Sequence, residues 1–179
     1  MTREIDIRTL IRSVPDFPKP GILFRDITTL LKDPAGFHAV VEKLFAAYRD
    51  SRVEKVAGIE SRGFIVGAAL AYRLHAGFVP IRKGGKLPAE NFDQDYQLEY
   101  GADRLEVHRD GIQPGERVLL VDDLIATGGT AEAALRLIRI AGGSVVGCAF
   151  VIDLPDLGGR ARLESSGYPV LALCEFPGH

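Results

Sequence analysis

The segment Arg117–Thr130 constrains the fold of this chain more than any other part of the sequence. It begins with a continuous apolar run, Val118 to Val121, which is typical of a strand that is covered on both faces of a sheet. Two carboxylates and a loop of small residues follow. Apolar residues then recur at helical spacing from Ala131 to Ile138. A buried strand that leads through a short loop into a helix indicates a parallel α/β sheet.

The loop between this strand and this helix predicts an anion site. Its residues are Ala126, Thr127, Gly128, Gly129 and Thr130. Free N–H groups and the dipole at a helix N-terminus attract anions, and glycine lets the backbone approach a phosphate. Asp122 and Asp123 would repel a phosphate, but they are suited to accept hydrogen bonds from ribose hydroxyls or to hold Mg²⁺. The segment therefore predicts a ligand with both a ribose and a 5′-phosphate.

Two other nucleotide-binding motifs do not fit this loop. A P-loop ends in Gly-Lys-Ser/Thr, and the loop contains no lysine. A dinucleotide fingerprint needs three spaced glycines before the helix, whereas only Gly128 and Gly129 are present. An ordinary strand-to-helix corner with solvated aspartates is the simplest alternative, but it does not explain why two acids, two glycines and two threonines coincide here.

Strands and helices alternate along the rest of the chain. The pattern predicts helices at Glu4–Ser13, Pro34–Tyr48 and Phe64–Leu74, and strands at Glu54–Ile59, Phe78–Arg82, Val145–Ile152 and Val170–Leu173. The polar stretch Gly84–Gln97 is predicted to be mobile, and Gln97–His108 to form an edge hairpin. This alternation predicts an α/β fold with a mainly parallel, twisted sheet flanked by helices.

Length and charge agree with one compact domain over residues 1–179. The 22 basic and 24 acidic side chains give a net charge of −2, so no basic excess suggests nucleic-acid binding. Cys148 and Cys174 lie in apolar runs and are predicted to be buried thiols. Residues 1–12 lack the apolar core of a signal peptide, and no apolar run reaches transmembrane length. We therefore expect a cytoplasmic protein without a membrane partner.

Four further segments resemble the signatures of a known enzyme family. They are Asp16–Asp26 (DFPKPGILFRD), Glu60–Phe64 (ESRGF), Ile81–Pro88 (IRKGGKLP) and Leu98–Gly101 (LEYG). Together with Arg117–Thr130, they resemble the signatures of type I phosphoribosyltransferases, in the same order and over nearly the whole chain. The acid pair alone indicates only this superfamily, whereas the other four segments resemble its adenine-specific members.

This resemblance implies a fold, a reaction and an assembly. The expected fold is that of the type I phosphoribosyltransferases, with a small flexible hood built from residues 1–30 and 84–108. The expected reaction converts adenine and phosphoribosyl diphosphate (PRPP) to AMP and pyrophosphate with Mg²⁺, as in purine salvage. The expected working form is a homodimer, in which a basic side chain near Arg82 and Lys83 can reach the neighbouring site.

Two segments are expected to bind pyrophosphate. From the residues alone, Ser61 and nearby N–H groups can hold an anion at a strand end, and Arg62 can supply charge. The resemblance assigns this role to six residues, Glu60, Ser61, Arg62, Arg82, Lys83 and Lys86, with a cis peptide between Glu60 and Ser61. Arg62 and Lys86 would help to stabilise the departing pyrophosphate. Relatives often carry an arginine at the position of Gly85, so one cation of this patch is absent here.

The remaining site residues also follow from the resemblance. Phe24 would stack on one face of adenine and Leu154 would pack on the other, while the backbones of Leu23 and Arg25 read the edge of the base. Two residues of the hairpin complete the site: Glu99 as general acid or base, and Tyr100 nearby in the closed site.

Two alternative functions remain open from the sequence. The first is a type I transferase that acts on another base, such as xanthine or orotate; the Phe24-Arg25 segment and Glu99 argue against it. The second is a PRPP-responsive regulator that has lost catalysis. Such regulators usually carry an added nucleic-acid-binding surface, and this chain has neither a spare segment nor a basic excess for one.

Overall fold

A seven-stranded sheet forms the centre of the computed structural model, which describes residues 5–98 and 101–178. The strand order is β5-β6-β4-β3-β7-β8-β9. The strands are β3 (Lys55–Ile59), β4 (Gly77–Lys83), β5 (Asn91–Leu98), β6 (Gly101–His108), β7 (Arg117–Ile125), β8 (Ser144–Asp153) and β9 (Val170–Glu175). The five strands from β4 to β9 pair in parallel, and β5 and β6 add an antiparallel edge. The predicted α/β fold with a mainly parallel sheet is confirmed.

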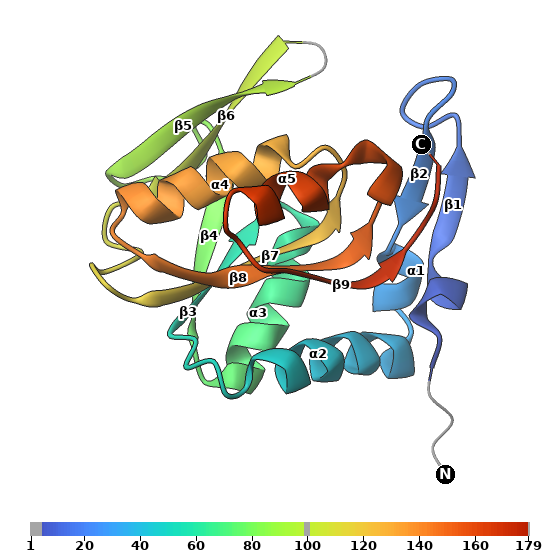
Figure 1. Ribbon diagram of the computed structural model, residues 1–179, viewed down its shortest axis with the longest axis horizontal. Coiled ribbons are helices and arrows are strands. Elements are labelled where there is room, and N and C mark those ends of the chain that lie inside the picture. The colour runs from blue at the N-terminus through green and yellow to red at the C-terminus, as the bar shows by residue number, and fades with distance from the viewer. Residues whose placement is uncertain (1–4, 99–100, 179) are drawn as a thin grey trace.

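Helices cover both faces of the parallel strands (Figure 1). The helices are α1 (Thr28–Leu31), α2 (Pro34–Tyr48), α3 (Arg62–Leu74), α4 (Gly129–Ile140) and α5 (Gly159–Ser165), with short 3-10 turns η1 (Ile7–Leu10) and η2 (Pro155–Leu157). The predicted helix at Pro34–Tyr48 is confirmed at both ends. It begins where the Asp33 side chain accepts a hydrogen bond from the Gly36 N–H at 2.7 Å, with Pro34 at its first position.

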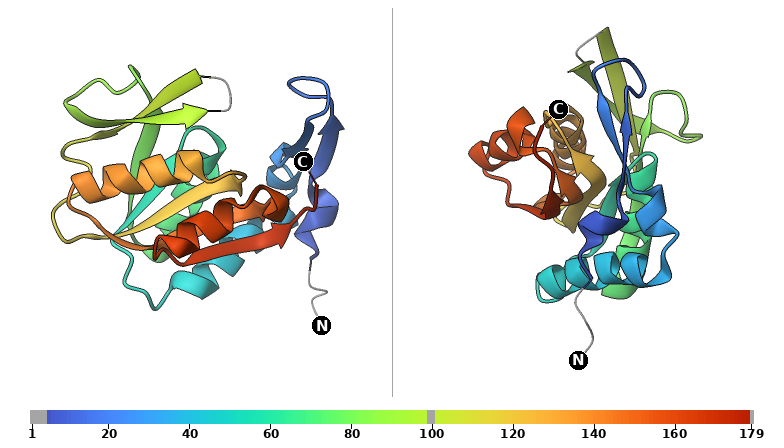
Figure 2. Two further views of the ribbon diagram at one scale, coloured as in Figure 1. Left: turned by 45° about the horizontal axis from the view of Figure 1, so that its top comes forward. Right: turned by 90° about the vertical axis from the view of Figure 1, so that its right-hand side faces the viewer.

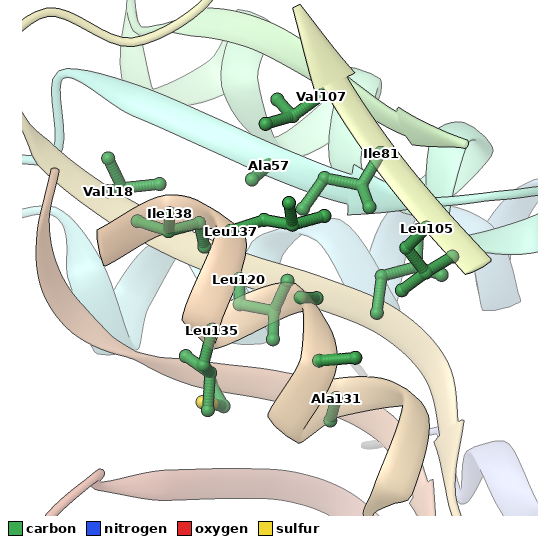
Figure 3. Packing of buried hydrophobic residues seen from close by; sticks show 14 of the residues in the cluster. Ala57, Ile81, Leu105, Val107, Val118, Leu120, Ala131, Leu135, Leu137 and Ile138 are labelled. Carbon is green, nitrogen blue, oxygen red and sulfur yellow. The ribbon is translucent and has the colours of Figure 1, made fainter. Parts of the chain in front are cut away.

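Strand β7 shows why the sheet is covered on both faces. Val118 and Leu120 pack with α4 (Figure 3), whereas Leu119 and Val121 belong to the second core, with α2 and α3. All four side chains are fully buried, as their uninterrupted apolar run predicts. The strand is thereby fixed along its length, and its carboxyl end presents Asp122 and Asp123 at the edge of the sheet.

The predicted helix at Glu4–Ser13 is wrong. Only Ile7–Leu10 forms a 3-10 turn, and Arg12–Pro15 forms β1, which pairs antiparallel with β2 (Leu23–Asp26); Glu4 itself lies outside the described residues. The Arg12 guanidinium hydrogen-bonds the Asp26 carboxylate at the end of β2, and Ile11 is buried in the core. These tertiary contacts override the weak helical periodicity of a short segment.

The predicted edge hairpin is longer than its sequence pattern indicates. Strand β5 begins at Asn91 rather than at Gln97, and it pairs with β6 along its whole length. Its partly buried side chains alternate, but only Phe92 and Tyr96 pack on the core as hydrophobic residues. The polar residues between them conceal the strand pattern. The mobility expected for Gly84–Gln97 remains a prediction.

The two hairpins stand at opposite sides of the parallel strands (Figure 1 and the left view of Figure 2). β1–β2 comes from the predicted hood region 1–30, and β5–β6 from the region 84–108. Both cysteines are free and buried, as predicted. Within residues 5–98 and 101–178, no helix is long and apolar enough to cross a membrane.

Candidate active site

A cavity of about 730 Å³ opens at the carboxyl ends of the parallel strands, between the two hairpins. Its wall is formed by residues 21–25 of the β1–β2 hairpin, residues 59–62 at the end of β3 and the start of α3, residues 122–131 from the last part of β7 to the first turn of α4, and Tyr96 and Leu98 of β5. Leu154 and Leu157 close one end. The cavity therefore brings together most of the site residues predicted from the sequence, at the position where open α/β sheets bind ligands.

The loop 126–130 forms one wall of the cavity. Helix α4 begins at Gly129, directly after Gly128, which adopts a left-handed conformation with φ of 84°. Gly129 leaves its cavity side open, because a methyl group added there would meet no atom nearer than 3.7 Å. Thr127 and Thr130 also line the cavity. Backbone groups, two hydroxyls and a helix N-terminus thus face one space that can hold a phosphate.

The two aspartates at the end of β7 differ in their surroundings. Asp123 is 6% exposed, and its Oδ2 accepts a hydrogen bond from Arg62 Nε at 2.5 Å. Among the described residues, Asp122 forms no ion pair with a cation; its Oδ1 accepts a hydrogen bond from the Asp123 N–H at 2.8 Å. Burial, and then the neighbouring charge of Asp123, raise the pKa of Asp122 well above its ordinary value. Asp123 is therefore a paired carboxylate, whereas Asp122 is the one that gains most from a hydroxyl partner.

The turn after β3 approaches this acid pair through a glycine. The peptide between Glu60 and Ser61 is cis, as expected. A methyl group on Gly63 would lie 2.9 Å from Asp122 Oδ1 and 3.0 Å from Val121 O. Only glycine therefore allows α3 to begin so close to β7. This approach brings Arg62 to Asp123, and its guanidinium lies 5.5 Å from the centre of the Phe24 ring.

The basic patch after β4 is held by carboxylates. Glu60 accepts hydrogen bonds from Arg82 Nε at 3.3 Å, from the Lys83 N–H at 3.1 Å and from Lys86 Nζ. Burial alone would raise the pKa of Glu60, but these donors lower it to about 2. The Lys83 ammonium pairs with Asp103 at 2.7 Å. Lys83 lines the cavity directly, whereas Arg82 and Lys86 approach it through Glu60.

Another part of the cavity wall, away from the basic patch, is apolar. Phe24 and Leu154 both line it, and the edge of Phe17 packs against Phe24 with 5.2 Å between ring centres. The Arg25 guanidinium points elsewhere: it donates to Ser13 Oγ at 2.5 Å and lies 4.4 Å from the Phe176 ring. A flat base here would meet the main chain of β2 rather than this charge.

Leu157 and Tyr96 line the cavity but were not predicted as site residues from the sequence. Leu157 lies three residues after Leu154, and this spacing could have revealed it. Tyr96 lines the cavity from β5, and its hydroxyl donates to Asp103 at 3.3 Å. Burial raises the pKa of Tyr96. The same hairpin lies beside the phosphate loop, because a methyl group on Gly129 would lie 3.7 Å from Gln97 O. The other predicted hairpin residues, Glu99 and Tyr100, lie outside the described residues.

The donors around Asp122 fit only a substrate-borne metal ion. The part of the chain that the structure describes contains no cluster of three or more His, Cys, Asp and Glu side chains suited to a metal. Mg²⁺ is commonly held by one or two carboxylates together with substrate phosphates and water. Asp122 and Asp123 can complete such a shell, either directly or through water, but they do not form a metal cage by themselves.

A family model, described as the phosphoribosyl transferase domain, matches residues 26–168. The chain belongs to the phosphoribosyltransferase family. It is 63% identical to the adenine phosphoribosyltransferase of Nitrosospira multiformis, over 98% of this chain and 100% of the relative. A relative from Bradyrhizobium sp., also an adenine phosphoribosyltransferase, is 58% identical over the full length of both chains. These relatives place the chain in the adenine phosphoribosyltransferase branch of the family, as the sequence signatures indicated.

Solved structures agree with this assignment. Adenine phosphoribosyltransferase from Rhodothermus marinus has 53% identity and a TM-score of 0.90, with 95% of this chain and 96% of that chain covered. The Saccharomyces cerevisiae enzyme, solved with adenine and an imino-altritol bisphosphate, has 38% identity and a TM-score of 0.88, with 94% and 97% covered. The predicted type I phosphoribosyltransferase fold is therefore confirmed.

Proposed function

We propose that this chain transfers the phosphoribosyl group of PRPP to adenine, forming AMP and pyrophosphate. The observation that supports this most is that one cavity joins a phosphate-type loop, an acid pair and an apolar slot. These three parts match the phosphate, the ribose and the base of AMP. Full-length similarity to adenine phosphoribosyltransferases, one of them solved with adenine, supports the same reaction.

PRPP binds between the two ends of the cavity in this proposal. The N–H groups and hydroxyls of Ala126, Thr127, Gly128, Gly129 and Thr130 hold the 5′-phosphate. Asp122 and Asp123 accept hydrogen bonds from the ribose hydroxyls. Mg²⁺, when bound, would neutralise charge on the diphosphate, with Asp122 and Asp123 as its nearest carboxylates. These contacts fix the anomeric carbon in one place, which is the main contribution of positioning to the rate.

The departing pyrophosphate is stabilised at the opposite end. Ser61 and Arg62 contact it from the turn after β3, and Arg82, Lys83 and Lys86 supply positive charge from the loop after β4. Glu60 is not a direct ligand in this scheme, because a carboxylate repels pyrophosphate; it holds Arg82 and Lys86 beside the site instead. Preformed charges of this kind act where negative charge develops on the leaving group.

Adenine occupies the apolar slot between Phe24 and Leu154. Its N9 attacks the anomeric carbon while the bond to the pyrophosphate oxygen breaks, through a transition state with oxocarbenium character. The backbones of Leu23 and Arg25 pair with the amine edge of the base. A 6-oxo purine presents the opposite donors and acceptors there, so it would leave buried polar groups unpaired.

The hood completes the site in this proposal. The regions 1–30 and 84–108 close over the substrates and exclude water, which would otherwise hydrolyse PRPP. Closure brings Glu99 to the purine, where it assists proton transfer at N7 or N3, with Tyr100 beside it. Cys148 and Cys174 are both free thiols, which agrees with a single domain that works in the reducing cytoplasm.

We also propose that the working form is a homodimer, assembled through α3. Ile65, Ala68 and Tyr72 form an exposed apolar stripe on this helix, and Tyr72 is 85% exposed. The helix begins at Arg62, so a second copy on this stripe would lie close to the site. Tyr72→Glu should convert the dimer to a monomer in sedimentation experiments. Ile140→Glu, at an exposed position on α4, is the matched control and should leave the dimer intact.

Pyrophosphate release with PRPP, Mg²⁺ and each common nucleobase in turn tests the reaction. We expect catalytic efficiency with adenine to exceed that with hypoxanthine or guanine by about 10⁴-fold, the range that unpaired buried polar groups can give. Comparable efficiency with hypoxanthine would contradict the adenine assignment but leave the family unchanged. If the protein binds PRPP but releases no pyrophosphate with any base, the result would favour the alternative function, a PRPP-responsive regulator that has lost catalysis.

A further inference from the structure

A second glycine loop, far away in the sequence, supports the back of the phosphate loop. Gly159, the first residue of α5, donates its N–H to Ala126 O at 3.0 Å. A methyl group on Gly159 would collide with Ala126 O, and it would lie 2.7 Å from Gly128 N and 2.9 Å from Ile125 Cγ1. Two of these three atoms belong to the main chain of the phosphate loop, and a main chain cannot move aside as the end of a flexible side chain can.

The contact is equally close from the other side. A methyl group on Gly128 would lie 3.1 Å from both the Cα and the carbonyl oxygen of Gly159. In contrast, the next residue, Gly129, is open toward the cavity. The phosphate loop is therefore a single layer of backbone, with the ligand space on one side and Gly159 on the other.

Helix α5 is in turn fixed to the rest of the fold. Arg160 donates to Val170 O at 3.4 Å and to Glu175 Oε1 at 3.5 Å, which ties α5 to β9. Arg162 pairs with Glu132 in the first turn of α4, and Leu163 is fully buried. Gly159 consequently presses on the phosphate loop from an anchored element.

We infer that Gly159 is a positioning residue for the 5′-phosphate of PRPP. Without touching the substrate, it sets the distance between the main chain at Ala126–Gly128 and the body of the domain. A larger residue would push the loop toward the ligand space and misalign its N–H groups. The inference deepens the proposed function, since it takes the loop 126–130 as the phosphate anchor. No role for Gly159 follows from the sequence signatures, which end before it.

Gly159→Ala in the full-length enzyme tests this role by separating the two ends of the cavity. Calorimetry with ribose 5-phosphate probes the phosphate loop, and calorimetry with pyrophosphate and Mg²⁺ probes the opposite end. We expect ribose 5-phosphate to bind roughly 10- to 100-fold more weakly, the cost of about one lost hydrogen bond to a charged group, with pyrophosphate affinity unchanged. The KM for PRPP should rise more than kcat falls.

Gly143→Ala is the matched control. Its methyl group would lie 2.8 Å from Ile138 Cγ2 and 3.0 Å from Val118 Cγ2, in the core at the other end of α4. It should lower the thermal midpoint without changing the affinity for either ligand. If Gly159→Ala does not fold, Arg160→Gln is the second test. It removes contacts that tie α5 to β9, and it should weaken ribose 5-phosphate binding selectively, by a smaller factor.

Three results would overturn the role of Gly159: unchanged ribose 5-phosphate affinity in folded Gly159→Ala, an equal loss for both ligands, or no selective loss in Arg160→Gln where that variant has to decide. A wild-type enzyme that binds pyrophosphate but not ribose 5-phosphate would instead contradict the proposed function itself. The two failures are therefore distinguishable.

Discussion

The two ends of the cavity are built to hold anions in different ways. At the end of β7, the loop 126–130 offers backbone N–H groups, hydroxyls and a helix N-terminus, all without net charge. At the opposite end, most candidate ligands are full cations, and each of these cations has a carboxylate partner: Asp123 for Arg62, Glu60 for Arg82 and Lys86, and Asp103 for Lys83. One end of the cavity, the neutral end, is preformed from uncharged groups. The other end, the charged end, is formed by cations that are already paired with carboxylates of the same chain.

This difference has an energetic reason. A loop of uncharged groups costs the ligand-free protein little free energy. Several cations close together repel one another unless carboxylates lie beside them. In the proposed reaction, pyrophosphate would therefore exchange places with carboxylates, and it would gain less than it would from free cations. For a leaving group this is useful, because a product that binds too tightly slows turnover. The neutral end should then dominate PRPP affinity, while the charged end adjusts chemistry and release.

The largest effect is expected at Glu99, the residue that would assist proton transfer at the purine in the proposed closed site. Glu99→Gln should lower kcat by about 10²–10⁴-fold, the usual contribution of a general acid or base, because Gln cannot exchange a proton with the purine. PRPP affinity should remain almost unchanged. Single-turnover kinetics and PRPP titration measure the two quantities, and Glu90→Gln, an exposed carboxylate of the same hood, is the control. A fully active Glu99→Gln would leave Glu99 as a solvated hairpin residue.

Glu60 tests whether the charged end depends on its internal acids for stability. Its pKa is about 2 in the folded protein and 4.5 ordinarily, so the carboxylate contributes at most about 3 kcal/mol to the free energy of unfolding at neutral pH. Because the folded pKa is depressed, this contribution is complete above pH 4.5 and is lost as the pH falls toward 2. Glu60→Gln should lower stability at pH 7 and flatten its dependence on pH in this window.

Urea unfolding of wild type and Glu60→Gln at pH 7 and at a pH near 3.5 measures this effect. Glu42→Gln is the control, since Glu42 also pairs with an arginine, Arg73, but lies on the surface between α2 and α3. Its loss should be smaller, because water screens an exposed pair and leaves it little net effect on stability. Equal losses in the two variants would show that the Glu60 cluster is no stronger than an ordinary surface pair.

Asp122 and Asp123 lie between the two ends of the cavity. Substitutions of these two residues should have similar effects on PRPP affinity but different effects on the stability of the fold. Asp122→Asn and Asp123→Asn should each weaken PRPP binding by about 1.5–3 kcal/mol, or roughly 10- to 150-fold, through a lost charged hydrogen bond to the ribose. Their thermal midpoints should differ. Asp122→Asn removes a charge that burial and Asp123 disfavour, so it should be neutral or stabilising. Asp123→Asn leaves Arg62 without its carboxylate and should be destabilising.

PRPP titration and differential scanning calorimetry of both variants decide this prediction. Asp50→Asn, at a fully exposed surface position, provides the baseline. Unchanged PRPP binding in both variants would remove the acid pair from the site. The opposite order of thermal midpoints would show that Asp122, rather than Asp123, is the acid that the fold requires.

The neutral end could be predicted from the sequence, because all its signals are local. The buried run before Asp122, the glycines and the helical periodicity after Thr130 lie within one short segment, and the structure brings them together as expected. Helix α2 is local in the same sense, with a cap, a proline and a regular apolar face. Where local preference and tertiary packing agree, the sequence pattern is sufficient.

The charged end could be predicted only in part. Its cations are visible as residue types, but their partners come from elsewhere in the chain: Asp123 lies 61 positions after Arg62, and Asp103 lies 20 after Lys83. Strand β5 was missed because polar residues separate its two inward aromatic side chains. The Gly159 contact gives no local signal either. Such pairings depend on the register of strands and loops, which a single sequence does not reveal.

The smallest effect is expected at Asp103. Unlike the other substitutions, Asp103→Asn should strengthen ligand binding rather than weaken it. Asp103 lies beside the cavity and pairs with Lys83 at 2.7 Å, an interaction that raises the pKa of Lys83 and lowers that of Asp103. Lys83 is half exposed, so the pair contributes about 0.2–1 kcal/mol. If pyrophosphate must displace this carboxylate, Asp103→Asn frees the ammonium and should tighten pyrophosphate binding by roughly 1.5- to 5-fold.

The gain should shrink at high salt, because a newly free charge is more strongly screened than a paired one. Calorimetric titration at low and high ionic strength measures both features, with Asp95→Asn, whose partner Arg104 lies in the same hairpin, as the control without effect. Weaker pyrophosphate binding in Asp103→Asn would reverse the interpretation: Asp103 would then hold Lys83 in position, and the charged end would be as preformed as the neutral one.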